Sequence, residues 1–61
     1  MTKQNTRTTN NASLHIRAGN PGAAARMVSA SIRAAMSNKS RAELLTWAQA
    51  AGLTNHPDFI I

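Results

Sequence analysis

The stretch NNASLHIRAG, residues 10–19, decides how the chain begins its fold. Leu14 and Ile16 alternate there with polar residues, and this period of two is typical of a short β-strand. The segments that follow have helical patterns, so the strand has no partner within its own chain. The alternation therefore predicts a strand over 13–17 whose pairing partner must come from outside its own chain.

The length and composition of the chain also favour association with another chain. Its 61 residues form one domain at most, and twelve of its twenty-six hydrophobic residues are alanine. A domain of about 60 residues buries only about 60% of the surface of its unfolded chain, so a thin core usually needs further stabilisation. Because the chain has no cysteine, neither disulfides nor thiolate metal sites can supply it. Oligomerisation, as in a homodimer, or docking onto a partner is the remaining route to stability.

The charge of the chain indicates the class of its partner. Seven Lys or Arg residues and two acidic residues give a net charge of +5, which favours polyanionic partners, with nucleic acid before membrane. No apolar run approaches the roughly 20 residues of a membrane span, and no secretory signal is visible. We expect a cytoplasmic protein that binds DNA and has no membrane partner.

The polarity pattern divides the chain into three parts. Residues 1–12 are almost entirely polar, which predicts a disordered basic arm. Residues 13–53 are predicted to form a strand-helix-helix domain, and residues 54–61 form a C-terminal tail with an apolar end. The expected fold class is therefore mainly α, with one short N-terminal strand.

Two amphipathic helices are predicted after the strand. The first extends from Pro21 to Ser37, with Asn20 as its N-cap and the proline at the first helical position. The second begins at Ser40 with the capping-box pattern SRAE and ends near Ala51. The expected shared core consists of Leu14, Ile16, Val28, Ile32, Met36, Leu44, Leu45 and Ala48.

This order of elements, together with NKSRAELLTWA at residues 38–48, resembles the ribbon-helix-helix repressors of the Arc and MetJ type. The resemblance covers residues 13–51 and implies an intertwined dimer whose two strands enter the DNA major groove as an antiparallel ribbon. It also implies that the start of the second helix binds a DNA phosphate. Two residues depart from the family pattern: Asn38 replaces the usual glycine, and Trp47 occupies a position that is usually polar.

The resemblance implies a dimeric, sequence-specific DNA-binding protein, either a small transcriptional repressor or an organiser of a DNA site. Side chains on the outer face of the ribbon would contact bases, and basic or N-terminal groups would contact phosphates. The predicted base contacts are Ser13, His15 and Arg17. The predicted phosphate contacts are Lys3, Arg7, Lys39, Ser40 and Arg41.

Two other binding functions stay open on the sequence alone. The chain could be a small helical protein that binds and inhibits or adapts another protein, because large apolar residues are frequent interface anchors. The candidate anchors are Trp47, Phe59, Ile60 and Ile61. A helix-turn-helix is suggested by WAQAAGLT at residues 47–54, but its recognition helix would contain Pro57 and end before two full turns.

The sequence does not predict an enzyme. The two carboxylates, Glu43 and Asp58, have no evident catalytic partner, and the two histidines, His15 and His56, are too few for a three-ligand zinc site. No nucleophile elbow or phosphate-binding loop is present. We expect no catalytic residue, no metal, no cofactor and no small-molecule substrate.

Overall fold

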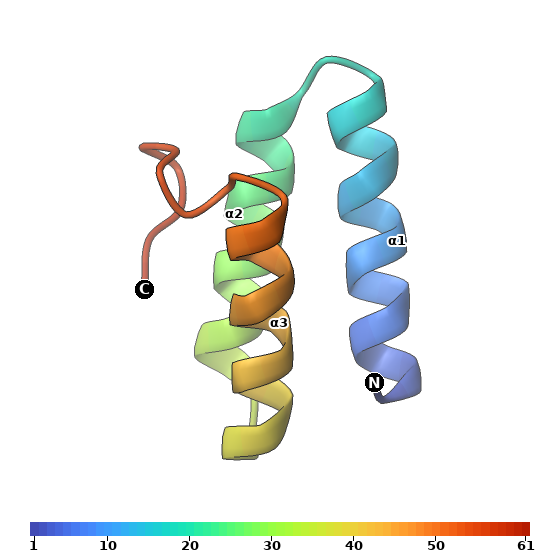
Figure 1. Ribbon diagram of the computed structural model, residues 1–61, viewed down its shortest axis with the longest axis vertical. Helices are drawn as coiled ribbons and strands as arrows, with labels where there is room; N and C mark the ends of the chain where they lie inside the picture. The colour runs from blue at the N-terminus through green and yellow to red at the C-terminus, as the bar shows by residue number, and fades with distance from the viewer.

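The computed structural model describes residues 1–61 and contains three helices: α1 (Lys3–Arg17), α2 (Pro21–Ala34) and α3 (Asn38–Ala50). Figure 1 shows α1 and α3 running in one direction and α2 in the other, followed by a C-terminal tail without regular structure. The chain contains no strand. The predicted strand-plus-two-helices fold is therefore wrong, and the intertwined ribbon that depends on this strand is lost with it.

The segment expected to be an arm and a strand is the helix α1, because its inward residues follow a helical period. Asn5, Thr9, Ala12 and Ile16 lie at intervals of four, three and four, which places them on one face of a helix. The first three are buried and Ile16 packs against the core. The helix begins after Thr2, whose side chain accepts a hydrogen bond from the N–H of Asn5 at 3.1 Å.

A buried polar contact joins the first turn of α1 to the first turns of α3. The side chain of Asn5, only 3% exposed, donates to the carbonyl of Ser40 at 3.1 Å and to Oε1 of Glu43 at 3.4 Å. In return, Oγ of Ser40 donates to Oδ1 of Asn5 at 3.0 Å. Because each buried polar atom has a partner, α1 can pack with a polar residue at a core position.

The two predicted helices are present with shifted ends. Pro21 occupies the start of α2 as predicted, whereas the side chain of Asn20 makes no capping hydrogen bond. The N-cap of α3 is Ser37 and not Ser40, since Oγ of Ser37 accepts from the N–H of Ser40 at 3.0 Å. The predicted helix end at Ser37 and the capping box at Ser40 are therefore wrong.

The core lies between all three helices and is half alanine. Small side chains let the helices approach closely, so few large residues are needed to fill the space between them. Of the predicted core, Leu14 and Met36 are wrong: these side chains are 59% and 99% exposed. Ile16 and Leu45 are only partly buried. The buried hydrophobic residues are Ala12, Ala24, Ala25, Val28, Ile32, Leu44, Ala48 and Leu53.

The tail after α3 folds back along α2. Asp58 lies 3.9 Å from the guanidinium of Arg26, and Arg33 donates a hydrogen bond to the carbonyl of Ile60. Gly22 allows this approach, because a Cβ there would lie 2.7 Å from Oδ2 of Asp58. The carboxylate therefore sits beside the first turn of α2, where the helix dipole favours a negative charge. None of the three helices combines the length and apolarity required to cross a membrane.

Candidate nucleic-acid interface

The two acidic side chains lie away from the outer face of α1. Glu43 is on α3, 3.5 Å from the N-terminal ammonium group, and Asp58 is on the tail beside Arg26. Residues 1–42 contain no Asp or Glu at all. The cationic residues of α1 therefore have no acidic neighbour on their own helix to offset their charge.

The outward face of α1 carries a stripe of three cationic residues, one amide and one leucine opposite its buried face. Its members follow the helical period at intervals of four, three, four and three. All five are exposed. The outer stripe of α1 consists of Lys3, Arg7, Asn10, Leu14 and Arg17. From end to end it extends about 21 Å along the helix axis.

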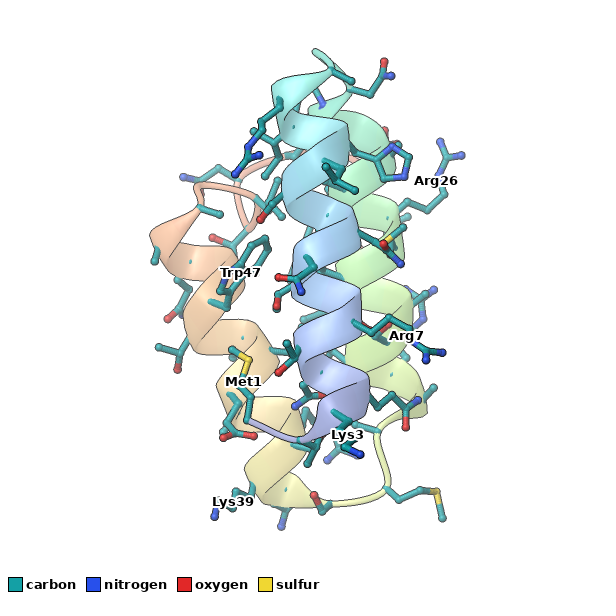
Figure 2. The ribbon with its side chains drawn as sticks, turned by 90° about the vertical axis from the view of Figure 1, so that its right-hand side faces the viewer. Met1, Lys3, Arg7, Arg26, Lys39 and Trp47 are labelled. Carbon is teal, nitrogen blue, oxygen red and sulfur yellow. The ribbon has the colours of Figure 1, made fainter.

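Figure 2 views the molecule from the side of α1. Lys3 and Arg7 project from this helix toward solvent, near its first two turns. Arg26 projects from α2 on one side, and Lys39 lies at the end where α3 begins. Helix α1 carries three of the seven Lys and Arg residues, against two on each of the other helices, and its helical backbone fixes their spacing.

The three predicted base contacts do not share a face. On a helix, two residues two positions apart point about 200° apart, so His15 points away from Ser13 and Arg17. Ser13 and Arg17 instead line a hollow beside Trp47. The outward alternation expected from a strand is therefore wrong, although Arg17 is still exposed as the last member of the outer stripe.

Some of the predicted phosphate contacts are exposed and free of ion pairs, and others are hydrogen-bonded within the fold. Lys3, Arg7 and Lys39 are exposed and make no ion pair. Ser40 has its hydroxyl hydrogen-bonded to Asn5 and its backbone N–H capped by Ser37. Its two donors are occupied within the fold, so Ser40 is a structural residue at the junction of α1 and α3.

Arg41 donates hydrogen bonds to carbonyl groups at the C-terminal end of α2. Its guanidinium donates to the carbonyl of Ala35 at 2.9 Å and to the carbonyl of Ile32 at 3.4 Å. It also donates to Oδ1 of Asn38 at 3.2 Å. Helices end with carbonyls that lack partners, and a cation there also complements the helix dipole. The geometry gives Arg41 a role in joining α2 to α3, where the sequence suggested a phosphate contact.

The apolar residues considered as protein anchors separate into two pairs. Trp47 and Phe59 are partly buried and pack against the core. Ile60 and Ile61 are 63% and 65% exposed at the end of the chain. Only the last two residues thus present most of their side-chain surface to solvent.

The sequence reasoning missed two members of the outer stripe: Asn10, which was placed in a disordered arm, and Leu14, which was placed in the core. The signal was present, because Lys3, Arg7 and Asn10 already have helical spacing, but the polar composition favoured a disordered arm.

No family model, curated protein or solved structure matches this chain. Its function must therefore be argued from the residues and geometry of the chain itself.

Proposed function

We propose that this protein binds DNA through the outer stripe of α1. The observation that carries the proposal is the alignment of Lys3, Arg7 and Arg17 on one exposed helix face in a segment without acidic residues. Lysine and arginine neutralise phosphates and release their counterions, which supplies most of the affinity of a protein for DNA.

The other side chains of the stripe suit the same partner. Asn10 can donate to a phosphate oxygen or to a base edge, and Leu14 can contact the apolar face or methyl group of a base. Neither side chain introduces a charge that would repel the DNA backbone. The stripe therefore combines electrostatic attraction with groups that can contact bases.

The packing of α1 favours this use of its outer face. Hydrogen bonds from Asn5 to α3 and burial of Ala12 hold the helix against the rest of the bundle. The backbone that carries the cations is therefore ordered before DNA arrives. A preformed surface loses less conformational entropy on binding than a disordered arm with the same charges.

The salt dependence of DNA binding tests the proposal. Three phosphate contacts predict that the logarithm of the association constant falls with the logarithm of salt concentration with a slope of about −2 to −3. Fluorescence anisotropy of a labelled DNA oligonucleotide, titrated with the protein between about 50 and 200 mM salt, measures this slope.

Arg7→Ala is the matched variant for the same titration. Loss of one contact is expected to make the slope shallower by about 0.7 to 0.9. Arg26→Ala removes the same charge from a residue beside Asp58 and is expected to leave the slope nearly unchanged. A wild-type slope near zero, or equal changes in the two variants, would exclude the outer stripe of α1 as the binding surface.

A further inference from the structure

A hollow lies beside the outer stripe, between the last turns of α1 and α3. Its volume is about 370 Å³. Figure 2 shows Trp47 projecting from α3 into the space next to α1. The side chains around the hollow come from these two helices and from Ala51, the C-cap of α3. They are Ser13, Ile16, Arg17, Trp47, Ala50 and Ala51.

The lining combines an aromatic surface with a cation and a hydroxyl group. Trp47 is half-buried and packs against the core, so its indole is held in place while part of it faces the hollow. Ala50 and Ala51 carry only methyl groups and leave room beside the ring. Arg17, which makes no ion pair within the chain, supplies positive charge at the rim.

These groups match the parts of one nucleotide. Proteins that bind single-stranded nucleic acid stack bases on aromatic side chains while a cationic groove follows the backbone. In a duplex, both faces of each base are covered by neighbouring bases, so a base must be unpaired and turned outward to stack on protein. The hollow lies between α1 and α3 and not on the convex outer face of α1, so it is a suitable place for such a base.

We infer that the hollow binds an unpaired base of single-stranded DNA, stacked on Trp47, with the adjacent phosphate at Arg17. This inference rests on the proposed function and names the form of DNA that the site prefers. The strand continues from Arg17 along the outer stripe toward Arg7 and Lys3. A duplex can bind along the outer stripe but lacks the stacking contact with Trp47.

The fluorescence of Trp47 reports whether the hollow is occupied, because Trp47 is the only tryptophan of the chain. An oligothymidylate is expected to quench Trp47 emission as it binds, and a duplex at the same phosphate concentration is expected to leave the emission almost unchanged. Anisotropy of the labelled DNA, recorded in the same titration, measures binding independently of the tryptophan.

Ala50→Leu fills the hollow from an exposed position and leaves the indole in place. We expect it to remove the quenching and to weaken oligothymidylate binding about tenfold, the scale of one lost stacking contact. Ala42→Leu, at an exposed alanine on the same helix but outside the hollow, is the matched control and is expected to behave as wild type. Thermal unfolding of both variants checks that the bundle is retained.

The outcomes separate the inference from the proposed function. Equal quenching by single-stranded and duplex DNA, or quenching that survives Ala50→Leu, overturns the inference even when anisotropy shows that DNA binds. No anisotropy change with either form of DNA overturns the proposed function itself.

Discussion

Leu44→Ala is expected to lower the free energy of unfolding by about 2 to 5 kcal/mol. Leu44 is 1% exposed and is one of the few large side chains in a core that is half alanine. Its truncation leaves a cavity that neighbouring alanines cannot fill. Domains have about 0.05 to 0.15 kcal/mol of stability per residue, which gives a chain of this length about 3 to 9 kcal/mol, so the variant loses a large fraction of its stability.

Leu14→Ala is the matched control, because it removes the same atoms from an exposed site on α1. It is expected to change the stability by less than about 0.5 kcal/mol. Urea unfolding followed by far-ultraviolet circular dichroism measures both variants. In a strand-based dimer Leu14 would be a core residue, so a loss at Leu14 comparable to that at Leu44 would contradict the three-helix bundle.

Arg7→Glu is expected to weaken DNA binding by at least about tenfold at low salt, which corresponds to about 1.4 kcal/mol. The substitution removes a proposed phosphate contact of the outer stripe and places a negative charge against the DNA backbone. Arg7 is exposed and makes no ion pair, so the bundle should remain folded.

Arg26→Glu changes the net charge of the protein by the same amount on another helix. Its effect on DNA affinity is expected to be several-fold smaller, because Arg26 lies outside the outer stripe and salt screens charges that make no direct contact with the DNA. The titration with labelled DNA is repeated on both variants, and their melting curves confirm folding. Equal losses of affinity would mean that only net charge matters and that α1 has no special role.

The helices α2 and α3 could be predicted because their signals are local. Pro21 marks the start of α2. Amphipathic segments that contain alanine lie on both sides of the turn between α2 and α3. By contrast, α1 was not recognised, because its buried face contains the polar residues Asn5 and Thr9 and the helical spacing of its exposed residues was outweighed by its polar composition. Asn5 is acceptable in the interior only because Ser40, distant in sequence, provides both a donor and an acceptor. Such compensation has no local sequence signature.

Hydrogen bonds between residues distant in sequence also explain why the candidate site was only partly predicted. Lys3 and Arg7 were expected to contact phosphates, and they lie on the exposed face that we propose for DNA. Arg41 has the same sequence character, yet its guanidinium is bound to carbonyls at the end of α2. Which basic side chains remain available thus depends on tertiary hydrogen bonds. Charge and spacing alone did not separate Arg41 from Lys3 and Arg7.

The most direct test of the central claim maps the DNA contact residue by residue. Isotope-labelled protein is titrated with a DNA oligonucleotide, and shifts of the backbone and side-chain NMR signals are recorded. We predict that the largest changes follow the outer stripe, at Lys3, Arg7, Asn10 and Arg17, with little change at Ile60. Changes concentrated on the C-terminal tail, or the absence of any change, would contradict DNA binding through α1.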